Sequence, residues 1–180
     1  MAKLYFKFGA MGCSKTAQAL ITKFNYEERD MKVLLLKPAT DTRDGADILR
    51  SRIGLEARAV IVPENCDVYA LYKNDYPDRQ VVIVDECQFL TPEQVDQLGQ
   101  IVIDYNVPVL CFGLRTDFQT KLFPGSRRLF EIAESITEIK SVCKCGAKAT
   151  VNARLDDDGN VVYEGDQVCL GGNSRYVPMC

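Results

Sequence analysis

The sequence contains no histidine among its 180 residues. Histidine is the usual general base near neutral pH and a common zinc ligand. Its absence excludes imidazole from both tasks. Any proton transfer must therefore fall to a carboxylate or a similar group, and any zinc site must depend on cysteine.

The chain also lacks an excess of positive charge, because 22 Lys and Arg residues are outnumbered by 25 Asp and Glu residues. A net charge of −3 provides no cationic field for general binding to nucleic acid or to an anionic membrane. We therefore expect no nucleic-acid partner and no membrane partner. Any nucleotide site must be local.

Long apolar runs and a secretion signal are missing as well. No basic segment followed by an apolar stretch begins the chain, and no run reaches transmembrane length. We expect a cytoplasmic protein whose eight cysteines are reduced, either as buried thiols or as metal ligands. With 47% hydrophobic residues, the chain has room for one compact domain and a small appendage.

What the chain does contain is a phosphate-binding motif near its start. An apolar run over residues 4–8 breaks at Gly9 into a loop that ends in Lys15 and Thr16. This follows the pattern G-x-x-x-x-G-K-[ST], with Ser14 where the second glycine is expected. Backbone N–H groups, a helix N-terminus and a lysine together attract phosphate. The residues predicted to contact the phosphates of ATP are Gly9, Ala10, Met11, Gly12, Cys13, Ser14, Lys15 and Thr16.

The alternative for this loop is a chance turn between a strand and a helix. If the backbone at Ser14 has a positive φ, serine costs about 1 to 2 kcal/mol relative to glycine there, which a well-braced loop tolerates.

The next segments predict a βαβ unit. Residues 32–37, apolar from Val33 to Leu36, read as a buried strand stopped by Pro38. Residues 41–52 show no strong periodicity, so we expect a solvated loop; alternatively, Arg43 or Arg52 closes over the phosphates as a cationic clamp. A short strand over 59–62 and a short helix over 68–72 follow. Between the phosphate loop and the strand over 32–37 the sequence predicts a helix, and its expected core-facing side chains are Ala17, Leu20, Ile21 and Phe24.

Two acids follow a second buried strand. Residues 81–84 are all apolar, and Asp85 and Glu86 come directly after them. Asp85 occupies the position of a carboxylate that holds Mg²⁺ together with Thr16. Successive strand residues point to opposite sides, so Glu86 is expected to face the nucleophile as general base. The alternative is that the acids are charges near a helix N-terminus, because residues 91–94 form a capping box with proline at its first helical position.

The chain continues as a helix over 92–106, a strand over 107–113 and a loop with two aromatic residues, Phe118 and Phe123. These rings either stack on a planar base or form a small satellite core. A short helix near 129–133 and a strand over 136–142 complete the pattern. The fold class is α/β: a P-loop, RecA-like parallel sheet flanked by helices, with a small C-terminal zinc-ribbon-like domain.

We expect residues 1–142 to form the nucleotide-binding domain and residues 143–180 the small one. Cys143 and Cys145 lie on a knuckle, and a hairpin brings Cys180 back, which predicts thiolate ligands for a structural Zn²⁺. Cys169 is a candidate for the fourth ligand, although the spacing also leads us to expect a ligand in a tail beyond Cys180. The alternative is a set of cysteines without metal.

Taken together, these motifs resemble the type II, cellular-type thymidine kinases of bacteria, over essentially the whole chain. The resemblance rests on Met11 within the phosphate loop, on the Cys143 and Cys145 knuckle, and on residues 9–16, 41–43, 85–89, 113–118, 123–125 and 171–176. It implies ATP-dependent phosphorylation of the 5′-hydroxyl of thymidine or deoxyuridine in nucleoside salvage. It further implies a homotetramer and feedback by dTTP.

The resemblance also implies roles for matched residues. Lys15 and Thr16 would lie on the phosphates and Mg²⁺, Arg43 near the phosphates, and Glu86 would be the base. The backbone of residues 171–176, including Gly171 and Gly172, would bind the nucleobase. The side chains implied around thymine are Met11, Phe89, Leu114, Phe118, Phe123 and Tyr176.

This sequence departs from the family pattern in two places. Ser14 replaces a glycine, and a fourth zinc ligand, usually Cys or His, would lie past Cys180. Two other functions stay open: a RecA-like ATPase stimulated by nucleic acid, which the acidic charge disfavours, and a non-catalytic zinc-ribbon interaction module on a nucleotide-sensing domain.

Overall fold

The computed structural model describes residues 1–39, 47–168 and 175–180. In this part of the chain the main sheet has six strands in the order β5-β2-β6-β7-β1-β8, and every neighbouring pair is parallel. The expected α/β class with a parallel sheet is therefore confirmed. The strands are β1 (Leu4–Phe8), β2 (Val33–Pro38), β5 (Val60–Val62), β6 (Val81–Val84), β7 (Val109–Gly113) and β8 (Ser135–Glu138).

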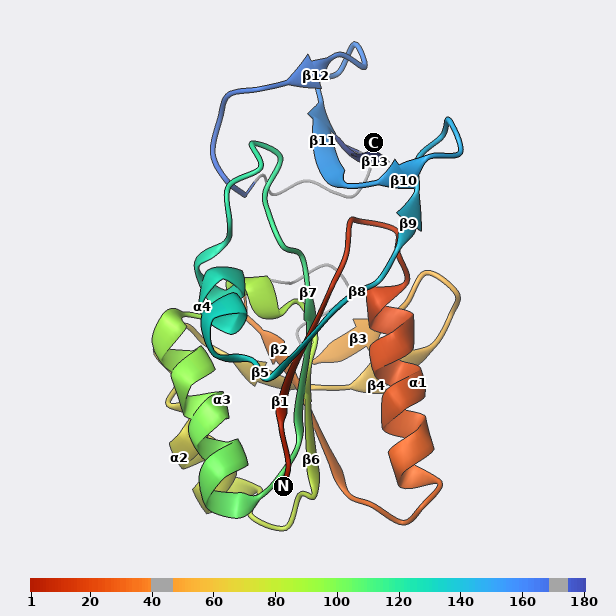
Figure 1. Cartoon of the computed structure of the whole chain (residues 1–180). Helices are drawn as coiled ribbons and strands as arrows, with labels where there is room; N and C mark the ends of the chain where they lie inside the picture. Colours follow the sequence, from red (N-terminus) through yellow and green to blue (C-terminus); the bar gives the residue numbers. More distant parts are fainter. Residues whose placement is uncertain (40–46, 169–174) are drawn as a thin grey trace.

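Helices cover both faces of the sheet (Figure 1). One face carries α1 (Lys15–Glu27), and the other carries α2 (Val68–Asp75), α3 (Pro92–Tyr105) and α4 (Pro124–Ile132). Alternate strand residues feed two separate cores: Val82 and Val84 pack with the α3 side, whereas Val81 and Ile83 pack with the α1 side. A strand buried on both faces explains why residues 81–84 are apolar without alternation.

The prediction for the buried face of α1 is only partly right. Ala17 and Leu20 are buried, but Ile21 and Phe24 are 45% and 59% exposed. The side chains that pack on the sheet are Ala19, Leu20 and the half-buried Tyr26. Helical spacing therefore indicated a helix correctly but extended its contact stripe toward Ile21 and Phe24 instead of toward Ala19 and Tyr26.

Two other expectations need correction. The stretch expected as a loop, residues 41–52, contains the strand β3 (Ile48–Arg50), which pairs antiparallel with β4 (Glu56–Arg58) just beyond it. The strand expected over 136–142 is divided into β8 and β9 (Ser141–Val142), because the chain leaves the main sheet after Ile139, whose N–H donates to the Phe8 carbonyl at 2.7 Å. Here β9 pairs with β10 (Lys148–Ala149) instead.

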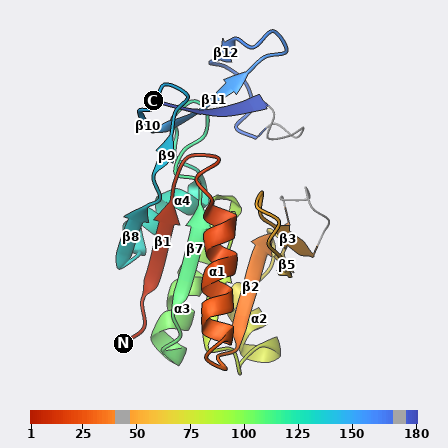
Figure 2. The ribbon, with the colours of Figure 1, turned by 90° about the vertical axis from the view of Figure 1, so that its right-hand side faces the viewer.

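The C-terminal part forms small antiparallel ribbons beyond one end of the main sheet (Figures 1 and 2). Here β11 (Val151–Leu155) lies between β12 (Val161–Val162) and β13 (Tyr176–Met179). The division into domains 1–142 and 143–180 stays a prediction.

The start of α3 matches the sequence in detail. The Thr91 hydroxyl accepts from the Gln94 N–H at 3.2 Å, the Gln94 side chain accepts from the Thr91 N–H at 3.1 Å, and Pro92 is the first helical residue. This confirms the predicted capping box. Within the described ranges, the structure contains no helix with the length and apolar character needed to cross a bilayer.

Candidate nucleotide site

The candidate site lies at the carboxyl edge of the parallel sheet. The phosphate loop leaves β1, the two acids leave β6 and the aromatic loop leaves β7, all at the end of the sheet that faces the C-terminal ribbons (Figures 1 and 2). Ligands of open α/β sheets bind at this edge because the loops after several strands meet there.

The phosphate loop is a tight turn with little room for side chains. A Cβ on Gly9 would lie 2.5 Å from both the Cys13 Sγ and the Ile139 carbonyl oxygen, so this position requires glycine. Gly12 has a φ of 74° and Ser14 has a φ of 63°. Ser14 therefore adopts the backbone conformation that glycine favours.

Lys15 is held within the curve of this loop. It is only 8% exposed, and its ammonium donates to the carbonyls of Ala10 at 2.8 Å and Gly9 at 3.2 Å. The same ammonium lies 3.5 Å from the Cys13 Sγ. The loop thus keeps a full positive charge beside the backbone turn predicted to receive phosphate.

Thr16 and Asp85, the two residues predicted to hold Mg²⁺, are in direct contact. The Thr16 hydroxyl donates to Asp85 Oδ2 at 2.7 Å, and Asp85 is 1% exposed. The other oxygen, Oδ1, is buried without a hydrogen-bond partner among the described residues. Burial raises the pKa of Asp85 to about 7, and the negative charge of Glu86 is the second cause. The hydrogen bond from Thr16 and the positive charge of Lys15 lower this pKa, but by less.

This pair fits a small hard cation. Mg²⁺ binds oxygen ligands and commonly uses one carboxylate together with water and substrate phosphates. An orphaned carboxylate oxygen next to a threonine hydroxyl offers such a ligand set, and a cation would also offset the cost of ionising a buried acid.

Glu86 lies beside Asp85 but not for the predicted reason. Strand β6 ends at Val84, and Glu86 has a left-handed backbone with a φ of 52° at the start of the 3₁₀ turn η1 (Cys87–Phe89). The argument from strand alternation is therefore wrong. The orientation of the carboxylate is instead fixed by Gln88, whose Nε2 donates to Glu86 Oε2 at 2.5 Å.

Gln88 is a site residue that the sequence analysis missed. It is 1% exposed, and its Oε1 accepts from the Leu114 N–H at 3.0 Å. One buried amide thus connects the acidic turn after β6 with the loop after β7. Gln88 lies within the matched stretch 85–89, but the sequence analysis gave it no role.

The aromatic residues of the predicted nucleoside site form two groups. Phe89 and Phe123 meet edge to face with ring centroids 5.8 Å apart. The guanidinium carbon of Arg154 lies 3.7 Å from the Phe118 ring centroid and 5.2 Å from that of Tyr176. Buried Phe118 and Phe123 and half-buried Phe89 and Tyr176 suit both a base-stacking wall and a satellite core.

The phosphate loop is also tied to the C-terminal ribbon. The Met11 N–H donates to Asn152 Oδ1 at 2.7 Å. The loop after β7 makes a separate contact, because Arg115 Nη2 donates to the Thr150 carbonyl at 3.3 Å. Asn152 was missed by the sequence analysis because nothing in the pattern of β11 indicates a contact with a loop about 140 residues earlier in the chain.

Several predicted residues lie outside the described residues, namely Arg43, Cys169, Gly171 and Gly172. Arg52, the other candidate clamp, is exposed and lies beside the phosphate loop. Its Nη1 is 3.8 Å from the place that a Cβ on Gly12 would occupy.

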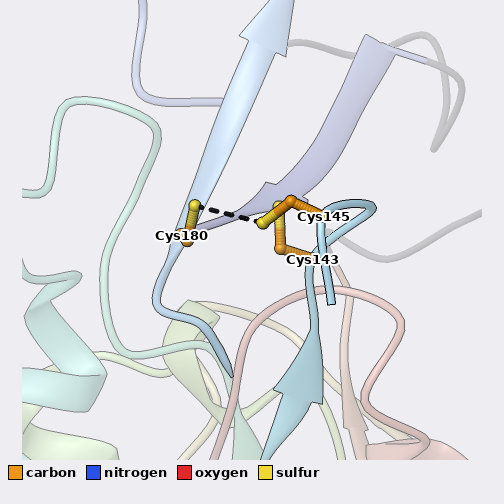
Figure 3. A group of neighbouring side chains, drawn as sticks. All are labelled: Cys143, Cys145 and Cys180. Carbon is orange, nitrogen blue, oxygen red and sulfur yellow. Dashed lines mark hydrogen bonds between the residues drawn. The ribbon is translucent and has the colours of Figure 1, made fainter. Parts of the chain in front are cut away.

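The predicted zinc ligands converge (Figure 3). The sulfur atoms of Cys143, Cys145 and Cys180 lie within 4.8 Å of one another, and those of Cys145 and Cys180 are 3.7 Å apart. Backbone N–H groups of Cys145 and Cys180 are the main cause that lowers the pKa of Cys143 to about 7. Three convergent thiols, one of them with a lowered pKa, suit Zn²⁺, which binds thiolates.

Comparison with known proteins gives a consistent result. The family model described as thymidine kinase matches residues 2–180. The thymidine kinase of Enterobacteria phage T4 is 50% identical over 182 aligned residues, covering 100% of this chain and 94% of the relative. The thymidine kinases of Zymomonas mobilis and Vibrio vulnificus are each 44% identical, again over 100% of this chain and over 94% and 95% of their own lengths.

Replacing Ser14 with glycine should stabilise the protein. The left-handed backbone costs serine about 1 to 2 kcal/mol, and the greater freedom of glycine in the unfolded chain offsets part of the gain, so we expect the free energy of unfolding to rise by up to about 1 kcal/mol. Denaturant unfolding measures the change. Ser14→Ala is the control, since it removes the hydroxyl but keeps the strain. Equal stabilities for the glycine and alanine variants would contradict strain at this position.

The Asp85 carboxyl should make the metal-free protein less stable as the pH rises. Because the pKa of Asp85 is raised from 3.8 to about 7 on folding, the folded state binds an extra proton between these values. The protonated Asp85 carboxyl therefore contributes stability that is fully present below about pH 4 and is lost as the pH rises to 7 and the buried group ionises. Asp85→Asn lacks this titration, so the variant should gain stability over the wild type across this range. Thermal unfolding of both proteins in a chelator from pH 4 to 8 measures the difference; a constant difference would contradict it.

Proposed function

Because the chain belongs to the thymidine kinase family, we propose that it transfers the γ-phosphoryl group of ATP to the 5′-hydroxyl of thymidine or deoxyuridine. The product is the nucleoside monophosphate, as in nucleoside salvage. The observation that carries the proposal is the contact of Thr16 with buried Asp85, directly beside Glu86 and the Lys15 loop. A phosphate cradle, a cation site and a carboxylate base are what phosphoryl transfer to an alcohol needs.

The phosphates of ATP would lie on the N–H groups of the loop from Gly9 to Thr16, next to the Lys15 ammonium. Arg52 is near enough to Gly12 to reach the same phosphates, and Arg43 remains a proposed contact by family resemblance. Asp85 and Thr16 would hold Mg²⁺, which neutralises charge on the transferring group when bound. The main catalytic contribution of these residues is positioning and charge balance.

Glu86 would accept the proton of the 5′-hydroxyl as this oxygen attacks the γ-phosphorus. Gln88 donates to Glu86 Oε2 and so fixes the orientation of the carboxylate. The same amide side chain accepts from the Leu114 N–H, on the loop that would bind the nucleoside. The base and the acceptor site are thus linked by one buried residue.

The nucleobase would be enclosed by apolar side chains on several loops and by the backbone of Gly171 and Gly172. A narrow pocket of this kind admits a pyrimidine and excludes a purine by size. The side chains proposed to line it are Met11, Phe89, Leu114, Phe118, Phe123 and Tyr176.

Other proposals follow from the family. Cys143, Cys145 and Cys180 would bind structural Zn²⁺, supported by their convergent sulfur atoms. A homotetramer is supported by the exposed apolar side chains of Ile21 and Phe24 on α1. Feedback by dTTP and a cytoplasmic location rest on the family resemblance alone.

Replacing Glu86 with glutamine should abolish most turnover while thymidine still binds. Loss of a general base typically slows a reaction about 10² to 10⁴-fold, and the neutral amide is close in shape to the carboxylate. Steady-state kinetics and thymidine titration measure the two effects. Near-normal turnover would remove Glu86 from the role.

ATP consumption tests the function itself and its two alternatives. We expect ADP to form in a 1:1 ratio with thymidine monophosphate only when thymidine is present, with little activity on deoxyguanosine. Stimulation by DNA in the absence of nucleoside would indicate a RecA-like ATPase. No consumption under any condition would indicate a non-catalytic module.

A further inference from the structure

Arg154 on β11 is a buried cation that pairs with no carboxylate in the part of the chain that the structure describes. Its exposure is 8%, and no ion pair involving it occurs among the described residues. Burying a charge is costly unless its polar groups are satisfied. In Arg154 the polar groups are satisfied by oxygen acceptors, and aromatic rings lie against the cation. These partners constrain the orientation of the guanidinium group.

The guanidinium group binds residues that are separate along the chain. Its Nη2 donates to Tyr176 Oη at 2.6 Å and to the Asp166 carbonyl at 2.8 Å, and its Nε donates to the same Tyr176 oxygen at 3.0 Å. Its carbon lies 3.7 Å from the centre of the Phe118 ring. A planar cation at this distance stacks on the ring in a way that the compact ammonium of lysine cannot reproduce.

A second set of hydrogen bonds fixes the same region from the side of the loop after β7. Buried Asp117 accepts from the N–H groups of Gln119 at 2.8 Å and Lys121 at 3.0 Å. Its other oxygen accepts from Gln167 Nε2 at 2.9 Å. Gln167 is also within 3.4 Å of Arg154 through its carbonyl, so Phe118 and Tyr176 belong to one connected network.

We propose that Arg154 is a positioning residue for nucleoside selection, which sets the places of Phe118 and Tyr176 through stacking and two hydrogen bonds. The inference rests on the proposed function, because it assigns these two rings to the nucleobase. Arg154 acts through them rather than on the reacting atoms. Its loss should weaken nucleoside binding and leave the function of the phosphate loop and Glu86 unchanged.

The test compares Arg154→Lys with Arg154→Met in the full-length protein. In both variants we expect the Kd for thymidine and the KM for thymidine to rise about 10-fold or more, because the planar stacked cation and its charge-assisted hydrogen bonds are lost. Calorimetry without ATP measures the Kd. The KM for ATP and kcat at saturating thymidine should stay within about 3-fold. Arg127→Met is the matched control, because Arg127 is 73% exposed on α4 and should bind thymidine as the wild type does.

A double-mutant cycle separates positioning from a general structural effect. Tyr176→Phe keeps the ring but removes the oxygen that accepts from Arg154. If Arg154 acts through this oxygen, Arg154→Lys should have a clearly smaller effect in the Tyr176→Phe background, whereas independent effects would multiply. Tyr176→Phe alone should also weaken thymidine binding. Because the cycle uses only Arg154→Lys and Tyr176→Phe, it still tests the inference if Arg154→Met does not fold.

The possible outcomes distinguish this inference from the proposed function. Wild-type protein that binds no pyrimidine nucleoside would overturn both. Wild-type protein that binds thymidine, with Arg154→Lys binding equally well, would overturn only the role of Arg154. A loss confined to kcat, or effects of Arg154→Lys and Tyr176→Phe that simply multiply, would also overturn it. A raised thymidine KM with unchanged ATP KM, and coupling between the two positions, would support it.

Discussion

The site depends on a contact between two side chains that follow β1 and β6, strands that are not neighbours in the sheet. Thr16, after β1, reaches Asp85, after β6, although β7 lies between them in the sheet. The contact requires the turn after β6 to pass closely over the end of β7. Gly113 allows this passage, since a Cβ there would lie 2.6 Å from both the Cys87 Sγ and the Gln88 Oε1. A missing side chain at the end of the middle strand therefore lets the phosphate loop and the acids meet.

The electrostatics of this contact suit a site that exchanges charge with its ligands. Burial and the charge of Glu86 raise the pKa of Asp85, which favours a neutral carboxyl when no ligand is bound. The Lys15 ammonium is meanwhile hydrogen-bonded to loop carbonyls. ATP with a divalent cation would bring anionic oxygens to Lys15 and positive charge to Asp85 together. Binding both is therefore more favourable than binding either one, which matches the chemistry of a metal–nucleotide complex.

The sequence predicted the parts of the site that depend on local pattern. The buried runs of β2 and β6, the capping box of α3 and the turn at Ser14 are properties of a few consecutive residues. The missed residues, Gln88, Asn152 and Arg154, are polar side chains whose partners lie 26, 141 and 22 positions away. Periodicity indicates which side of an element is buried, but it does not identify what the buried polar atom contacts. In α1 the error is of another kind, because Ile21 and Phe24 are apolar but exposed, and periodicity placed them on the buried side.

The C-terminal ribbon shows why three cysteines converge where they do. Its buried apolar residues within the described part are only Cys143, Ala149 and Ala153, and its other buried side chains there are polar. So little fully buried apolar area contributes only weakly against chain entropy, and small units in this situation commonly gain stability from a cross-link such as a metal. Because β11 also carries the side chains that contact Met11, Phe118 and Tyr176, order at the thiols would be transmitted directly to both the phosphate loop and the aromatic residues. A metal far from any reacting atom would thus support substrate binding by fixing one strand.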